Sequence, residues 1–219
     1  MRSATLKLIL ALAIAAVSLN ASVALGNSVM TYNGTGLNAV VKIHASGLLS
    51  DGRQVRAGQY LISYEGNDYT AYCVDIDAWA GTTEVVELGV DSLNNGDQVA
   101  YLYETYAGGV STGTGAGALA VSIWEVLYET SSTFGVSQYD GFFSISENPG
   151  VTSAGNSLLA TVPGSYTPLG DLVVLYSECR QDMLIMIPGG GQIIPEPITV
   201  LGLLLGTGSL AGYIRRRVA

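Results

Sequence analysis

The chain has 219 residues, a length that fits one domain with additional processing segments. Hydrophobic residues make up 48% of it and charged residues only 12%, about half the share in an average soluble protein. The net charge of −9 argues against nucleic-acid binding, which needs a basic face. A single histidine and two cysteines exclude paired-histidine metal sites, zinc fingers and iron–sulfur clusters.

Residues 1–26 have the pattern of a secretory signal peptide. Two basic residues begin the segment, an apolar run follows at residues 8–19, and small residues then allow cleavage after Ala24 or Gly26. An N-terminal membrane anchor is the alternative, but the apolar run is short for a membrane span. We therefore expect export of the chain across the inner membrane.

The next segment, residues 27–188, is expected to form one extracellular domain that begins with β-strands. Stretches rich in β-branched and aromatic residues predict strands at 38–45, 60–64, 69–75 and 84–88. Residues 65–68 have turn chemistry, so the second and third of these strands should form a hairpin.

Two helices are predicted at the centre of the chain. Asn95 can cap a helix that starts after it, and Gln98, three residues on, can complete a capping box. Residues 108–117 are rich in Gly, Thr and Ser and predict a linker. The apolar stripe at residues 118–129 then predicts a buried helix.

Short strand-like segments return after the second helix. They are expected at 139–145, 172–175 and 183–187, whereas residues 148–165 are expected to be a loop with a short helix around Leu158. The predicted fold class is therefore α+β, a β-rich sandwich or barrel with two central helices. A Gly-rich spacer at 189–194 ends the domain.

The middle of the chain is more acidic than the whole. Residues 27–194 contain 17 of the 18 acidic residues and only four basic residues, which are Lys42, Arg53, Arg56 and Arg180. The net charge of this part is thus −13. Such acidity promotes solubility and can attract divalent cations, but it does not define a fold.

Residues 195–219 carry the features of a membrane segment. Residues 198–214 are 17 uncharged residues, and a helix of this length spans about 25 Å, enough for a thin bilayer. Arg215, Arg216 and Arg217 follow at once, and basic clusters are retained on the cytoplasmic side. We expect a C-terminal transmembrane helix that leaves the domain outside.

The order of Pro195-Glu196-Pro197, an apolar helix and an arginine cluster resembles the PEP-CTERM sorting signal of Gram-negative bacteria that make exopolysaccharide. The resemblance implies a membrane-held precursor that an exosortase cuts near this motif. The released domain would reach the cell surface or the extracellular biofilm matrix, where exopolysaccharide is a partner to consider. An ordinary membrane anchor is the alternative. On the family interpretation the protein is the substrate of an enzyme and not itself an enzyme.

A strand ending in Tyr72-Cys73-Val74-Asp75 and a helix with Ser122-Ile123-Trp124 resemble the thioester domain of bacterial surface proteins, over about residues 40–129. The resemblance implies that a Cys thiolate attacks a Gln carboxamide, expels ammonia and leaves a thioester that can acylate a target. The Gln position falls on Ala120, which has no carbonyl carbon to attack. The resemblance therefore implies the fold without the usual bond, with Gln98 and Gln181 as the only substitutes we consider.

Three states of Cys73 stay open. A disulfide with Cys179 is the default for two cysteines in an exported protein. A buried free thiol is the second state, and a thioester or another reactive form is the third.

The acidic candidates are weaker. Asp75 and Asp77 could bind Ca²⁺ or form a glycosidase pair, but turn capping and solvation are the simpler interpretation. Residues 91–97 lack the ligand pattern of a calcium-binding EF-hand loop and predict a loop that enters a helix. Glu125 and Glu129, four residues apart, predict a solvated helix face. We expect no metal and no cofactor.

Other residues give no catalytic constellation. His44 has no partner that the sequence identifies and is expected to be structural, and no G-x-S-x-G nucleophile elbow occurs. The 13 tyrosines suit sugar stacking, but half-buried strand positions explain them more simply. The main hypothesis is a non-catalytic, surface-sorted structural or adhesive protein. The alternative is a covalent thioester adhesin or secreted hydrolase centred on Cys73.

Overall fold

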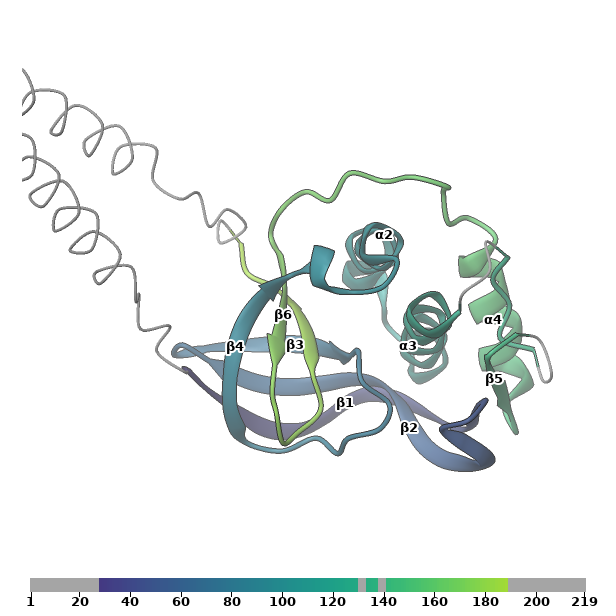
Figure 1. The fold of residues 1–219 in the computed structure, drawn as a ribbon, viewed down its shortest axis with the longest axis horizontal. Coiled ribbons are helices and arrows are strands. Elements are labelled where there is room, and N and C mark those ends of the chain that lie inside the picture. Colours follow the sequence, from purple (N-terminus) through teal and green to yellow (C-terminus); the bar gives the residue numbers. More distant parts are fainter. Residues whose placement is uncertain (1–27, 130–132, 138–140, 189–219) are drawn as a thin grey trace, which may run out of the picture.

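The computed structural model describes residues 28–129, 133–137 and 141–188 (Figure 1). The expected signal peptide, the Gly-rich spacer and the sorting signal with its transmembrane helix lie outside the described residues. Among the helices that are described, none is long and apolar enough to cross a membrane.

The described part of the chain is a sheet-rich α+β fold. Its strands are β1 (Ser28–Ala45), β2 (Leu49–Tyr64), β3 (Asn67–Cys73), β4 (Thr83–Gly89), β5 (Phe143–Ser146), β6 (Leu172–Tyr176) and β7 (Met183–Met186). Its α-helices are α2 (Gly96–Tyr106), α3 (Gly113–Tyr128) and α4 (Pro149–Leu159), with short 3₁₀ turns η1 (Val90–Ser92) and η2 (Ala107–Gly109).

All strands belong to one antiparallel sheet that closes on itself. The order is β2-β3-β7-β6-β4-β1-β5, and an additional pairing of β2 with β1 joins six of the strands into a ring. β5 lies outside this ring, paired with the far end of β1 from Lys42 to Ala45. Closure leaves fewer strand edges open to other chains. The helices gather on one side of this closed sheet (Figure 1).

The hairpin expected around residues 65–68 is confirmed as the β2–β3 connection. Tyr64 pairs with Asn67, so the loop consists of Glu65 and Gly66 alone. Both have positive φ, 49° and 79°, as the tight turns that match strand twist require. The strands expected at 38–45, 84–88 and 172–175 are also present as parts of β1, β4 and β6, and β7 covers residues 183–186 of the strand expected at 183–187.

The predicted linker at residues 108–117 is wrong in its second half, because α3 already begins at Gly113. Thr112 caps the helix, since its side chain accepts a hydrogen bond from the Gly115 backbone N–H at 3.0 Å. The glycines that suggested a linker instead allow close packing on β1. A Cβ on Gly113 would collide with the Asn38 carbonyl oxygen, and one on Gly117 would lie 2.9 Å from Ala39 Cβ.

The loop expected at residues 148–165 contains an 11-residue helix, α4, so the described part has three α-helices and not two. Asn148 caps it by accepting a hydrogen bond from the Val151 N–H at 3.2 Å. Gly155 brings α4 close to α3, where its carbonyl accepts a hydrogen bond from Ser122 Oγ at 3.2 Å. α3 is thereby enclosed, and every residue from Ala116 to Leu127 is buried, which confirms the predicted buried helix.

Asn95 stands at the expected helix start, but it does not form the predicted capping box. Its backbone is left-handed with φ of 51°, and its side chain makes no capping hydrogen bond to α2. The Asn95 amide instead donates to the Val126 carbonyl at 2.8 Å, and the Asn94 amide donates to the Leu127 carbonyl at 2.9 Å. Both carbonyls lie in the last turn of α3, where helix carbonyls lack partners of their own. The side chains of the two asparagines therefore cap the C-terminal end of α3, while only the Asn95 backbone carbonyl takes part in the start of α2.

We expect Asn95→Gly to lower the free energy of unfolding by about 1–2 kcal/mol, because it removes this donor while glycine still tolerates the left-handed backbone. Urea denaturation followed by tryptophan fluorescence measures the change. Asn33→Ala is the control, since Asn33 is exposed on β1 and should change stability by less than about 0.5 kcal/mol. Equal losses in the two variants would contradict the capping role.

Candidate functional site

The two halves of the thioester-like motif meet in space. Cys73 ends β3, and Trp124 lies in α3, 51 residues later. The Trp124 indole N–H donates to the Cys73 carbonyl oxygen at 2.9 Å, and both residues are buried. Ala120, one turn earlier on α3, is also fully buried in the core. The sequence pattern thus marks a contact between the strand end and the central helix.

The Cys73 thiol is enclosed in a small local turn. It donates to the Asp75 carbonyl oxygen at 2.8 Å and accepts from the Asp75 backbone N–H at 3.3 Å. Its side chain is 0% exposed, and this burial raises the pKa of the thiol far above its usual range, with the nearby Asp75 and Asp182 charges adding to the effect. Because a thiolate is the reactive form, Cys73 is a poor nucleophile in this state.

The Asp75 carbonyl oxygen accepts hydrogen bonds from two side chains at the end of β3. Besides the Cys73 thiol it accepts the Gln181 amide N–H at 2.8 Å. Of the two glutamines considered as substitutes for Ala120, the structure brings Gln181 beside Cys73. Gln98 instead donates to the Gly164 carbonyl at 3.4 Å.

The Asp75 carboxylate caps a turn, as the simpler interpretation expected. Its Oδ1 accepts from the Asp77 backbone N–H at 2.9 Å. No group of three or more His, Cys, Asp or Glu side chains among the described residues is arranged to hold a metal ion.

The disulfide expected between Cys73 and Cys179 is not formed, since both residues are free cysteines. Cys73 is buried against Asp75, whereas Cys179 lies exposed in the loop between β6 and β7. The Cys179 backbone N–H donates to Ser177 Oγ at 3.3 Å. The Arg180 backbone N–H donates to the same oxygen at 3.2 Å, so residues 177–180 form a tight turn. The second of the three open states, a buried free thiol, is therefore the one in the structure.

Glu125 and Glu129 do not form a solvated face, so that prediction is wrong. They are 1% and 4% exposed, and their carboxylates hold the chain that follows α3. Glu125 accepts from the Gly135 N–H at 2.7 Å, and Glu129 accepts from the Phe142 N–H at 2.9 Å. Backbone N–H donors of this kind compensate for the burial of a carboxylate.

His44 and the tyrosines have structural contacts. His44 Nε2 lies 3.1 Å from Ser146 Oγ and so links β1 to β5. Tyr72 and Tyr103 are buried, and their rings pack edge to face with 5.8 Å between the ring centroids. Burial raises the pKa of Tyr72 to about 12. Six other described tyrosines are partly buried against the core, but only Tyr60 and Tyr69 of these are in strands, so the half-buried strand interpretation is confirmed only in part.

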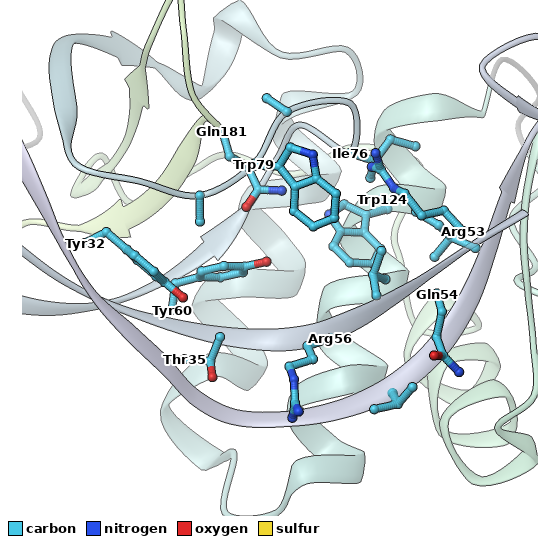
Figure 2. Close-up of a pocket in the computed structure, with 15 residues that line it drawn as sticks. Tyr32, Thr35, Arg53, Gln54, Arg56, Tyr60, Ile76, Trp79, Trp124 and Gln181 are labelled. Carbon is cyan, nitrogen blue, oxygen red and sulfur yellow. The ribbon is translucent and has the colours of Figure 1, made fainter.

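A pocket of about 420 Å³ opens beside the Cys73 turn, and its size is within the usual range for small-molecule sites. Its walls come from β1, β2, the loop after β3, the β6–β7 loop and α3. Figure 2 shows Tyr32 and Tyr60 at one end, Trp79 at the centre and Arg53 next to Trp79. The Arg53 guanidinium lies over the Trp79 ring, 5.2 Å from its centroid.

Sequence reasoning did not connect the residues of this pocket. The sequence indicates no site at Arg53 or Trp79, and it offers Gln181 only as a substitute for the glutamine that Ala120 replaces. One signal was available, because Arg53 and Arg56 are two of just four basic residues in the acidic middle of the chain. Trp79 lies 26 residues after Arg53 in the sequence, and no local pattern links the two residues.

Comparisons with protein-family models, with curated proteins and with solved structures give no match to this chain.

The state of the cysteines can be tested with a thiol reagent. In the folded protein we expect one thiol to react at neutral pH, because Cys179 is exposed and Cys73 is buried with a raised pKa. Two thiols should react after denaturation without reductant, and Cys179→Ser should leave the folded protein unlabelled. A disulfide would instead give no labelling of either state before reduction.

Proposed function

We propose that this protein is exported, sorted by an exosortase and delivered to the cell surface or extracellular matrix as a structural or adhesive component without catalytic activity. The observation that carries the proposal is the order of Pro195-Glu196-Pro197, the uncharged stretch at 198–214 and the cluster Arg215, Arg216 and Arg217. The inner membrane would hold the precursor, and the localisation, the partner exosortase and the association with exopolysaccharide all belong to this proposal.

The domain itself is proposed to be a thioester-like fold that works without the covalent bond. Two features support this. Ala120 stands where the resembled family has its glutamine, and the buried Cys73 thiol is hydrogen-bonded and disfavoured as a thiolate. The contact of Trp124 with Cys73 supports the likeness of the scaffold. Adhesion would then depend on non-covalent contacts.

One specific observation favours a second candidate, a thioester that uses Gln181. Its amide and the Cys73 thiol share the Asp75 carbonyl as an acceptor, at 2.8 Å each. In such a reaction Cys73 Sγ would bond to Gln181 Cδ, the Cδ–Nε2 bond would break, and ammonia would leave with the thiol proton. The raised pKa of Cys73 opposes the first step, so this candidate ranks second. A hydrolase centred on Cys73 meets the same obstacle.

The sorting proposal predicts that replacing Pro195, Glu196 and Pro197 by alanine leaves an uncleaved, membrane-held precursor in the native host. The reason is that the motif would no longer be recognised, while the apolar stretch would still hold the chain in the membrane. Mass spectrometry of the C-terminal peptide and cell fractionation measure the outcome. Alanine at Pro188, just before the spacer, is the control and should leave processing intact. An unchanged mature C-terminus in the triple variant would contradict the exosortase assignment.

Intact mass separates the two candidates for the domain. We expect the mass of the reduced, unmodified chain, because no bond joins Cys73 to Gln181. A thioester would lower the mass by about 17 Da through loss of ammonia, and methylamine would open it to an N-methylamide and a free Cys73 thiol, so that the deficit disappears. Gln181→Glu is the matched control, since glutamate keeps the shape but lacks the amide leaving group. A 17 Da deficit in the wild type that is absent from the Gln181→Glu variant would overturn the non-covalent proposal.

A further inference from the structure

The pocket beside Cys73 concentrates positive charge in a strongly acidic domain. Two of the four basic residues between 27 and 194 line it, Arg53 and Arg56. Among the described residues that form its walls there is no aspartate or glutamate. Because the rest of the domain is acidic, with a net charge of −13, this local positive site favours a ligand whose negatively charged group lies against the two arginines.

Arg53 is placed to pair with a carboxylate. Its guanidinium lies over the Trp79 ring, 5.2 Å from the ring centroid, and a guanidinium held on an aromatic face can still donate N–H hydrogen bonds to a planar acidic group. Its Nε is buried and has no hydrogen-bond partner among the described residues. Arg56, exposed at the rim, is 3.4 Å from the Asn38 side-chain oxygen and adds to the positive potential.

The pocket also has apolar rings and a second unused polar atom. Trp79 is 67% exposed, so a ligand can reach its ring, and Tyr32 and Tyr60 form a tilted pair with centroids 6.1 Å apart. Gln181 is only 7% exposed, yet its Oε1 has no hydrogen-bond partner among the described residues. Such an oxygen requires a donor, for which a hydroxyl is suitable.

Together these groups match one class of ligand. We propose that the pocket binds an acidic sugar residue of a polysaccharide, with its carboxylate on Arg53, its ring against Trp79 and a hydroxyl donating to Gln181. An acidic peptide would supply the carboxylate but not the hydroxyl-bearing ring, and a neutral sugar would leave Arg53 unpaired. The inference rests on the proposed function in one respect only, namely that the pocket meets its ligand outside the cell.

The test is a calorimetric titration of the full-length chain, purified in a mild detergent, with hexagalacturonate as the probe. We expect binding to hexagalacturonate and at least about tenfold weaker binding to the neutral cellohexaose and to hexaglutamate, because each lacks one of the two recognised features. Tryptophan fluorescence reports on the same site, since the chain has two tryptophans and both line the pocket.

Variants locate the binding. Arg53→Gln and Trp79→Ala should each weaken hexagalacturonate binding about tenfold or more, and Arg53→Lys should weaken it less than Arg53→Gln because it keeps the charge. Lys42→Gln is the charge-matched control outside the pocket walls and should bind as the wild type does. Unfolding curves of all variants verify that each is folded.

Three results would overturn the proposal. They are the absence of binding to hexagalacturonate, equal binding of cellohexaose or hexaglutamate, and a loss in Lys42→Gln as large as that in Arg53→Gln. None of them bears on sorting, which the alanine replacement of Pro195-Glu196-Pro197 tests separately. Failure of the binding proposal is thus distinguishable from failure of the proposed export and sorting.

Discussion

The hydrogen bond from the Trp124 indole to the Cys73 carbonyl ties the central helix to the end of β3, and the pocket depends on it. The chain leaves Cys73 as a loop, and this loop carries Trp79 over the pocket. Two further contacts hold the same loop, the Ile76 N–H to the Tyr128 hydroxyl at 3.2 Å and Gln181 to the Asp75 carbonyl. Because Tyr128 also belongs to α3, the helix fixes the start of the loop at two points. Buried hydrogen bonds of this kind are costly to break, since each leaves a polar group without a partner.

The same helix depends on close packing that only small residues permit. Gly113 and Gly117 let α3 lie against β1, and Gly155 lets α4 lie against α3. The buried carboxylates of Glu125 and Glu129 then hold the backbone that follows the helix. α3 is therefore in contact with the sheet, with α4 and, through these carboxylates, with the backbone at Gly135 and Phe142. This explains why one helix can position elements that are far apart in the sequence.

The strands were predictable from the sequence because their pattern is local. Alternating and β-branched residues marked β1, β3, β4, β6 and β7, and the turn residues Glu65 and Gly66 marked the hairpin. The start of α3 was not predictable in the same way, because glycines that usually break a helix here serve contacts with Asn38 and Ala39. Burial of Glu125 was hidden for a similar reason, since its partner is a backbone N–H that only the fold brings near. Local sequence patterns thus predict the secondary-structure elements. They do not predict hydrogen-bond or packing partners that belong to other segments of the backbone.

The candidate site likewise has one part that the sequence predicts and one part that it does not. The contact between Cys73 and Trp124 could be anticipated, because a known family pattern linked two separate segments. The pocket could not be anticipated from the sequence. Its groups come from β2, from the loop after β3 and from the β6–β7 loop, and no single segment has a pattern that predicts a binding site. Its position is nonetheless informative. The buried thiol faces the Asp75 turn and is closed to solvent, whereas Trp79 on the same loop is exposed beside a guanidinium. The part of the loop that a ligand can reach therefore offers stacking and charge, and it is the non-covalent chemistry of these groups that supports the proposed adhesive role.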